Sequence, residues 1–590
     1  MPHLNQTNTA NKRTFYSLIL AVLGVFGLAI SYNSSFEGIV LLPIFYITFV
    51  GYNTMPQKKI NLYILSGMLS IIYAITLILG VQLDIQSEIL FSLKTLIRIL
   101  LLSLEIFPFL AHFIIKTETY TFSQDSNCKF FRLCLFMIII SWILAYLALF
   151  PGVYATDAPY WYHEFYRSDI NISSQWSPVY CGLFYLFMRV GKNLSDDFSI
   201  GFALFTFIQM SFSIYVIWKI LSFINTHLNI KFVIAATLFF MLPTHVILAL
   251  TSAQDSVFTA CFAMSLLLLL EYCLNEENFT TSKNKMIKLF FWMALMCIAR
   301  NNGLYAILIL LAFALFLKAK KKLLILLIGT IATTLIYQGP VYNLCGIQKG
   351  TAIREILSLP LQQMAYVYNK DNLSQQEKSE MEKFVSEEGW KMYTSCISDP
   401  VKSNLNIEAF QKNKDSFFKL YSTCFFKHPR EYLQATGLQT FILWYPNKIW
   451  PDARPWHPFL DILCYDESIG YEPEFSIVRK SLFPQYEILL EKMFGFGAPG
   501  DGYGGNLDMF FSKIPIIGAL FQAGTYTWTL LYIVFYSAYK KNRKLFLIMS
   551  FILGVWFTVF LSPVIMYRYC APFIFTAPLY ISALLILREQ

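Results

Sequence analysis

The chain has 590 residues, of which 56% are hydrophobic and only 14% are charged, and its mean hydropathy is +0.51. A soluble chain of this length would cover much more of its surface with charge, so the composition excludes a soluble globular protein. The net charge of +9 does not indicate nucleic acid as a partner, because the basic residues form short clusters between apolar stretches, as topology signals do.

Apolar runs long enough to cross a bilayer recur along the chain, which predicts an all-α polytopic membrane protein and not a β-barrel. The first run lacks a small-residue cleavage pattern, so we interpret it as an anchor and not as a removed signal peptide. We expect about fourteen transmembrane helices, near residues 14–31, 36–54, 61–82, 87–115, 131–150, 198–221, 231–250, 253–272, 287–300, 302–318, 322–339, 515–538, 545–563 and 570–587.

The segment SPVYCGLFYLFMRV, residues 177–190, is apolar but short for a crossing. If it does not cross, six basic clusters fall on one side of the membrane, which the positive-inside rule makes the cytoplasm. These clusters are Lys12/Arg13, Lys58/Lys59, Lys129/Arg132, Lys283/Lys285/Lys288, Lys318/Lys320/Lys321/Lys322 and Lys540/Lys541/Arg543/Lys544. We therefore predict a helix on the outer membrane surface. The protein is expected in the cell (inner or cytoplasmic) membrane, with both termini cytoplasmic.

This topology divides the chain into four parts. They are the N-terminal transmembrane helices 1–4 (1–127), a transmembrane core with a first outer loop at 151–197 (128–339), a large extracytoplasmic loop domain (340–514) and three C-terminal transmembrane helices (515–590). In the large loop, Ser374 and Glu377 have capping-box spacing and predict an exposed helix. An oxidising compartment could pair cysteines of this loop, and the sequence leaves the pairing open among Cys345, Cys396, Cys424 and Cys464.

Acidic residues follow the predicted span that ends near residue 150. In PGVYATDAPYWYHEF, residues 151–165, Asp157, His163 and Glu164 lie among aromatic residues at the lip of the membrane. An ordinary loop acid would give the same local pattern. Asp255, in LTSAQDSVF, is expected at another outer turn, at similar depth. Ionisable residues near membrane depth are costly to place, which makes each a functional candidate.

Two arginines are expected at outer turns of the same face. Arg300 is followed by Asn301 and Asn302 in CIARNNGLY, and Arg568 lies between Tyr567 and Tyr569 in PVIMYRYCAPF. Snorkelling anchors are the ordinary explanation for arginine at a helix end. Positive charge is, however, disfavoured in short outer loops, and the planar guanidinium fork suits phosphate oxygens. The pattern therefore favours a lipid-linked phosphate, with a carboxylate as general base and arginines on the leaving group.

The chain resembles the GT-C superfamily of membrane glycosyltransferases from about residue 130 to its end. More closely, it resembles an uncharacterised bacterial group with that architecture. The motifs that carry the resemblance, in chain order, are FPGVYATDAPYW, SAQDS, RNNGLYAI, SDPVK, HPREYLQA and YRYCAPF. The resemblance implies a GT-C-like helix bundle with a surface helix in the first outer loop. It also implies a polyprenyl-phosphate sugar as donor.

By this resemblance Asp157 takes the place of the first-loop catalytic acid. Many superfamily members have paired acids there, whereas Ala158 follows Asp157 in this chain. We expect Asp157, Glu164 and Asp255 as catalytic residues, and His163, Asn301 and Asn302 in the pocket. The expected donor-phosphate residues are Arg300, Arg568, Tyr567 and Tyr569.

The expected function is transfer of a sugar from a polyprenyl-phosphate donor to an envelope glycan, lipid or protein on the extracytoplasmic face, with the lipid bilayer as a further partner. No cofactor is required, and a divalent metal, used by some branches of the superfamily, is not indicated by the sequence. Two alternatives stay open. A flippase or transporter of a lipid-linked saccharide should carry mid-span charges and broken helices, and an O-antigen polymerase or ligase also has many spans and one large outer loop.

Overall fold

The computed structural model describes residues 2–31, 38–56, 59–121, 128–154, 158, 162, 165–166, 172–195, 197–348, 352–370, 373–447, 477, 480–494, 514 and 517–588. These residues are helical almost throughout and include only isolated β-bridges, with no extended strand. An all-helical structure is expected in a bilayer, because a helix satisfies its own backbone hydrogen bonds where no water is present. The predicted fold class is therefore confirmed at this level.

Nine helical segments within the described residues are long and apolar enough to cross a membrane. A tenth span is obtained if α9 (Ile230–Phe240) and α10 (Pro243–Leu250), which meet at a bend of 54°, are counted as one. The protein is thus a multi-pass membrane protein by length and composition. The other expected spans also form helices, but shorter ones: α2 (Gly38–Asn53), α13 (Lys283–Ala299), α14 (Asn302–Phe316) and α26 (Ala523–Tyr539).

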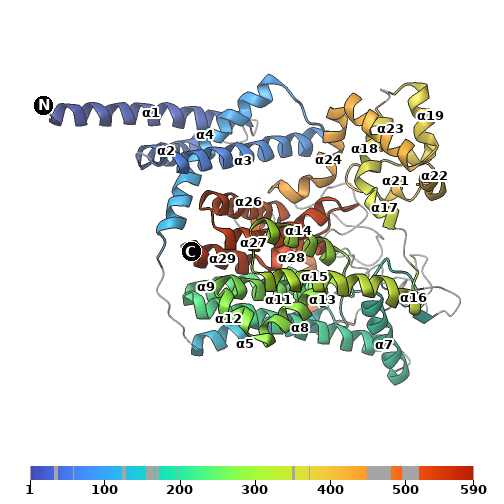
Figure 1. Ribbon diagram of the computed structural model, residues 1–590. Helices are drawn as coiled ribbons and strands as arrows, with labels where there is room; N and C mark the ends of the chain where they lie inside the picture. Colours follow the sequence, from blue (N-terminus) through green and yellow to red (C-terminus); the bar gives the residue numbers. More distant parts are fainter. Residues whose placement is uncertain are drawn as a thin grey trace.

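The first four helices form a layer on one side of the molecule (Figure 1). Here α1 (Pro2–Ser31) and α3 (Ile60–Gln86) both pack on α4 (Leu93–Thr119). The layer joins the rest through α3 and α26. Tyr73 stacks on Trp528 with ring centroids 4.3 Å apart, and its hydroxyl donates to the Trp528 carbonyl oxygen at 2.7 Å.

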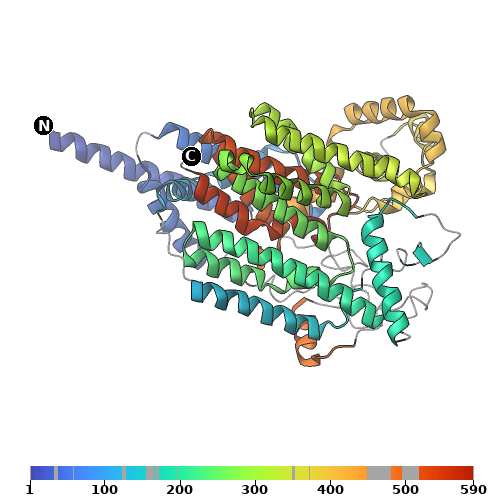
Figure 2. The same ribbon diagram turned by 60° about the horizontal axis from the view of Figure 1, so that its bottom comes forward.

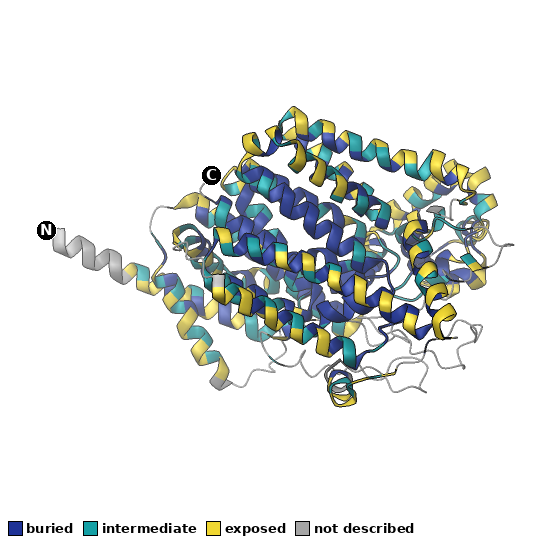
Figure 3. Cartoon of the chain, turned by 90° about the horizontal axis from the view of Figure 1, so that it is seen from below, coloured by how far each residue is buried: buried dark blue, intermediate teal, exposed yellow. Residues whose placement is uncertain are grey.

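The central bundle surrounds α11 (Asp255–Leu274). In the apolar stretch of this helix, 83% of the residues are buried. A helix that is apolar all round belongs in the interior. The outer helices have exposed faces (Figure 3), and large apolar side chains such as Phe136 and Ile208 lie on them, as suits lipid. Helix α11 packs against α8 (Ser199–His227), α13, α27 (Arg543–Phe560), α28 (Tyr567–Phe575) and α29 (Ala577–Leu587). In the next shell, α5 (Cys128–Ala148) packs on α8 and α15 (Lys321–Ile336) packs on α13.

A smaller unit packs at one end of the bundle, at the right of Figure 1. Its own hydrophobic core contains Met364, Trp390 and Phe417. The predicted capping box is confirmed: the Ser374 hydroxyl accepts from the Glu377 backbone N–H, and the Glu377 carboxylate accepts from the Ser374 N–H. The helices of this unit are α17 (Ala352–Ile356), α18 (Ser358–Tyr368), α19 (Gln375–Glu382), α20 (Glu387–Lys391), α21 (Asp399–Lys402), α22 (Ile407–Lys412) and α23 (Lys414–Lys427), and α24 (Pro429–Trp444) connects it to the bundle.

The ends of the bundle differ in what they carry. Helix α7 (Pro178–Ser195) and α16 (Tyr342–Leu344) lie at the same end as the smaller unit, whereas α1 begins and α29 ends at the opposite end (Figure 1). In Figure 2 α7, the teal helix at the right, runs across the other helices and not alongside them. The segment 177–190 is therefore helical and steeply inclined to the bundle.

Two glycines let α7 and α8 approach closely. A β carbon at Gly201 would clash with the Phe187 carbonyl oxygen, and one at Gly191 would clash with the backbone of Gly201. Because backbone atoms cannot move aside cheaply, we expect Gly201→Ala to lower the free energy of unfolding by about 1–3 kcal/mol. Thermal unfolding of the purified protein in detergent measures this change.

Gly339→Ala is the matched control, because a β carbon at Gly339 would meet no atom within 4 Å. Its unfolding temperature should equal that of the wild type. Equal unfolding temperatures for Gly201→Ala and wild type would contradict the close packing of α7 on α8.

Candidate functional site: a buried Asp–Arg–Arg cluster

Asp255 is placed in the middle of the molecule by the helix that it begins. It is the first residue of α11, the buried central helix, and only 2% of its surface is exposed. An acid in the first turn also interacts favourably with the positive end of the helix dipole. A buried carboxylate still needs a cationic or hydrogen-bonding partner, and two later segments of the chain supply cations.

Arg300 forms an ion pair with Asp255 through its Nη1 atom and the Oδ1 atom of the carboxylate. It is the C-cap residue of α13, directly after Ala299, and has extended backbone angles. Its guanidinium carbon lies 4.3 Å from the centre of the Tyr569 ring, a distance typical of a cation–π contact. Arg300 thus contacts an acid and an aromatic ring far from it in sequence.

Arg568 approaches the other oxygen of the same carboxylate, with 3.8 Å between its Nε and Asp255 Oδ2. It lies in the first turn of α28 and is 9% exposed. Its guanidinium carbon is 5.2 Å from the Tyr569 ring centre, and its Nη2 is 3.5 Å from the Tyr569 hydroxyl oxygen. One carboxylate therefore lies between two guanidinium groups that both contact one tyrosine ring. The expected convergence is found for Asp255, Arg300, Arg568 and Tyr569.

The other described candidates contact different partners. Asn302 donates from Nδ2 to Thr558 Oγ1 at 3.1 Å, and Asn301 accepts at Oδ1 from Gln338 Nε2 at 2.9 Å. The Tyr567 side chain is 2% exposed and hydrogen-bonds with Thr244. These three residues hold neighbouring helices together around the cluster, and their assignment to the pocket stays a prediction.

The start of the first outer loop is held beside the segment that leads to Asp255. The Val153 N–H donates to the Leu250 carbonyl oxygen at 2.9 Å, and the Ser252 N–H donates to the Val153 carbonyl oxygen at 2.9 Å. Gly152 has φ +139°, and a β carbon there would meet Thr206, so glycine fits this close approach to α8. The predicted loop residues Asp157, His163 and Glu164 lie outside the described residues.

A buried glutamine, not identified from the sequence, organises the same region. Gln209 lies within α8, is 4% exposed, and donates from Nε2 to the carbonyl oxygens of Ala249 at 2.9 Å and Thr251 at 2.7 Å. Its Oε1 accepts from the Tyr180 hydroxyl at 3.0 Å, so α7 is joined to the same loop. A single amide within the apolar stretch LFTFIQMSF was the available signal, because polar side chains at membrane depth need partners.

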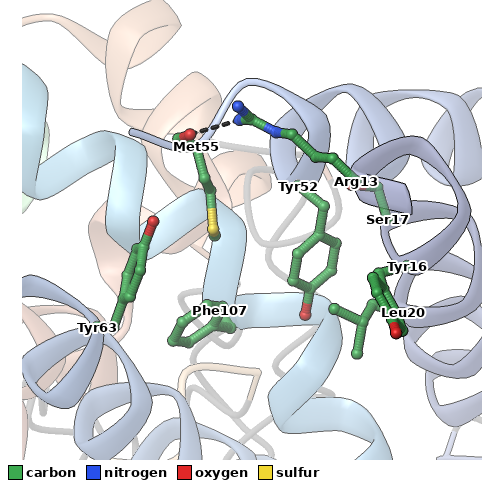
Figure 4. Close-up of a pocket in the computed structure, with 8 residues that line it drawn as sticks. All are labelled: Arg13, Tyr16, Ser17, Leu20, Tyr52, Met55, Tyr63 and Phe107. Atoms are coloured by element: carbon green, nitrogen blue, oxygen red, sulfur yellow. Dashed lines mark hydrogen bonds between the residues drawn. The ribbon is translucent and has the colours of Figure 1, made fainter. Parts of the chain in front are cut away.

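A cavity of about 340 Å³ lies elsewhere, between the N-terminal helices (Figure 4). Its lining is mostly aromatic and apolar, and its one arginine, Arg13, donates to the Met55 carbonyl oxygen. It offers little to recognise a charged substrate. No group of three or more His, Cys, Asp or Glu side chains within the described part of the chain could hold a metal ion.

The fold and the cluster together define a multi-pass, all-helical membrane protein with a buried Asp–Arg–Arg site at one end of its bundle. Residues 177–447 match the sequence profile of a family of unknown function, DUF6020. The match covers less than half of the chain; it includes Asp255 and Arg300 and excludes Asp157 and Arg568. No curated protein and no solved structure matches the chain significantly.

Proposed function

We propose that the protein is a membrane glycosyltransferase that takes a sugar from a polyprenyl-phosphate donor on the extracytoplasmic face. The observation that carries the proposal is that Arg300 and Arg568 both contact Asp255, next to the start of the first outer loop. Two guanidinium groups that meet at one place suit the phosphate that leaves when the glycosidic bond breaks, because each can present a planar pair of donors to its oxygens. Asp157 is proposed as the base that takes the proton from the acceptor hydroxyl.

The structure favours a positioning role for Asp255. Its carboxylate contacts both arginines, so it is well placed to hold the two guanidinium groups apart and oriented. A carboxylate that receives a proton from an acceptor must instead be open to that acceptor, and Asp255 is 2% exposed. In the proposed reaction, the acceptor oxygen attacks the anomeric carbon, the carbon–oxygen bond to the phosphate breaks, and the polyprenyl phosphate departs.

The proposed topology has about fourteen spans, with the short helices α2, α13, α14 and α26 counted as crossings. In that topology α7 lies on the outer membrane surface, which its inclination to the bundle supports (Figure 2). The bundle end that carries α7 and the smaller unit is then extracytoplasmic. The opposite end, where α1 begins and α29 ends, is cytoplasmic, in agreement with its lysine clusters.

One observation favours the transporter alternative. The bent pair α9 and α10 breaks a potential span at Pro243, and His245 is buried two residues later. Broken helices with polar residues near them are common in transporters. A flippase moves the lipid-linked sugar intact, so release of free polyprenyl phosphate separates the two functions.

Arg568→Lys tests the proposal at the cluster. Lysine keeps the charge but loses the two-pronged contact with a phosphate, so we expect transfer to fall by about 1.5–3 kcal/mol of transition-state stabilisation, roughly 10- to 150-fold. Membranes containing the variant would be assayed with radiolabelled polyprenyl-phosphate sugars. Rates and donor KM would be compared with those of the wild type.

Arg189→Lys is the matched control, because Arg189 is an exposed arginine that also lies near a tyrosine ring, 6.0 Å from that of Tyr185. It should transfer sugar as the wild type does. If Arg568→Lys had the rate and the donor affinity of the wild type, Arg568 would not contact the phosphate and would be only a snorkelling anchor. Absence of transfer from every polyprenyl-phosphate sugar would contradict the proposed function.

A further inference from the structure

A second cavity, of about 560 Å³, lies at the end of the bundle opposite the Asp255 cluster. Helix α11 connects the two, with Asp255 at its start and Tyr272 near its end. At a rise of about 1.5 Å per residue, these two residues are about 26 Å apart along the axis. The wall of the cavity is made by the turn after α14 (317–319), the turn after α26 (540–544) and Arg588 near the chain end. Its volume is in the range of small-molecule sites.

The charged side chains that line this cavity are almost all cationic. They are Lys318, Lys540, Lys541, Arg543, Lys544 and Arg588, against the single acid Glu276. Lys540 is neutralised by Glu118 on α4, with Nζ and Oε1 2.5 Å apart. The structure pairs none of Lys318, Lys541 and Arg543 with a carboxylate of a described residue. Cytoplasmic topology explains why this end is basic, but it does not require the cations to surround one cavity.

Two of these lysines occupy backbone positions that usually carry glycine. Lys318 and Lys541 have φ values of 55° and 53°, in the left-handed region, directly after the ends of α14 and α26. Each turn is closed by a backbone hydrogen bond of 2.9 Å, from Ala319 N–H to Ala314 and from Asn542 N–H to Ser537. Glycine is common there, and a residue with a β carbon costs about 1 kcal/mol or more. The two turns therefore hold lysine side chains at the cavity at a cost in stability.

The N-terminus of α27 adds a fixed partial charge to the same wall. Asn542 caps the helix, accepting from the Leu545 N–H at 2.9 Å, and donates to the Leu587 carbonyl oxygen at 2.6 Å. The N–H groups of Arg543 and Lys544, in the first turn, have no acceptor within the helix. Both residues line the cavity, so the positive end of the helix dipole is next to the lysines.

We propose that this cavity binds a phosphate-bearing anion, supplied either by the head group of an anionic lipid or by a soluble phosphate compound. Lysine ammonium groups and a helix N-terminus are the donors that proteins use for phosphate. The volume exceeds that of a single carboxylate, and the cationic excess suits more than one negative charge. The site is independent of the glycosyl transfer proposed at the other end of α11.

The test uses the full chain, purified and placed in phosphatidylcholine nanodiscs, with inorganic pyrophosphate and phosphatidylglycerol as probes. A ligand that binds the folded protein raises its unfolding temperature. We expect pyrophosphate to raise it if the ligand is soluble, and phosphatidylglycerol in the nanodisc to raise it if the ligand is a lipid head group. The double variant Lys318→Asn/Lys541→Asn should reduce the affinity for the effective probe at least about tenfold. Asparagine tolerates the left-handed backbone, so this variant removes charge without new strain.

The double variant Lys283→Asn/Lys321→Asn is the control. These two lysines are exposed, are predicted on the same cytoplasmic side and do not line the cavity, so the change in net charge is the same. The control should respond to the probe as the wild type does. An equal loss of response in both double variants, or no response of the wild type to either probe, would overturn the proposal. If Lys318→Asn/Lys541→Asn does not fold, Arg543→Gln, which leaves the backbone turns intact, replaces it with the same expectation.

Discussion

Replacing Asp157 with asparagine is expected to lower sugar transfer at least about 100-fold, the low end of the contribution of a general base. Asparagine keeps the size of the side chain but cannot take the proton of the acceptor hydroxyl. The protein should still insert and keep its unfolding temperature, because only the proton acceptor is removed. Transfer from radiolabelled polyprenyl-phosphate sugars by membranes of the variant measures the effect.

Asp169→Asn is the control for this experiment, because it makes the same chemical change in the same predicted outer loop. It should retain wild-type transfer. Near-normal activity in Asp157→Asn would exclude Asp157 as the base, and Glu164→Gln would then be the next variant to assay.

Asp255→Asn is expected to lower the free energy of unfolding by about 3–5 kcal/mol, the cost of removing one partner from a buried ion pair. Arg300 and Arg568 would lose the charge that holds their guanidinium groups in place. Thermal unfolding of the purified variant measures the loss. Transfer should fall as well, because the proposed phosphate contacts depend on those orientations.

The matched control is Asp197→Asn, which removes an exposed ion pair to Lys480, with Nζ and Oδ2 2.6 Å apart. Asparagine can still accept the Ser199 N–H bond that Asp197 makes, and an exposed pair contributes about 0–1 kcal/mol. If Asp255→Asn abolished transfer and left the unfolding temperature unchanged, Asp255 would act in the reaction itself and not as a positioning residue.

The charged residues of the Asp255 cluster are recognisable in the sequence, whereas their individual contacts are not. Asp255, Arg300 and Arg568 can be identified from the sequence because ionisable residues near membrane depth are costly and positive charge is disfavoured in short outer loops. Their meeting is expected from a shared outer face. Tyr569 follows Arg568 in the sequence, but the sequence does not specify that its ring also contacts Arg300. The role of Gln209 is not predictable from the sequence, because one amide in a long apolar helix gives the same pattern whether it faces lipid or, as here, two backbone carbonyl groups and the Tyr180 hydroxyl.

The sequence by itself determined the class of the protein, its apolar helices and the charged residues at their ends. Those features follow from composition and from local periodicity, since the thickness of the bilayer sets the length of an apolar helix. Only the tertiary structure decided which of these residues meet. Asp255, Arg300 and Arg568 come from three helices, and their contacts depend on how α11, α13 and α28 pack. The cationic cavity also depends on the tertiary structure. Its lysines appear in the sequence as separate topology signals, and they converge only because helix packing brings the helix ends together.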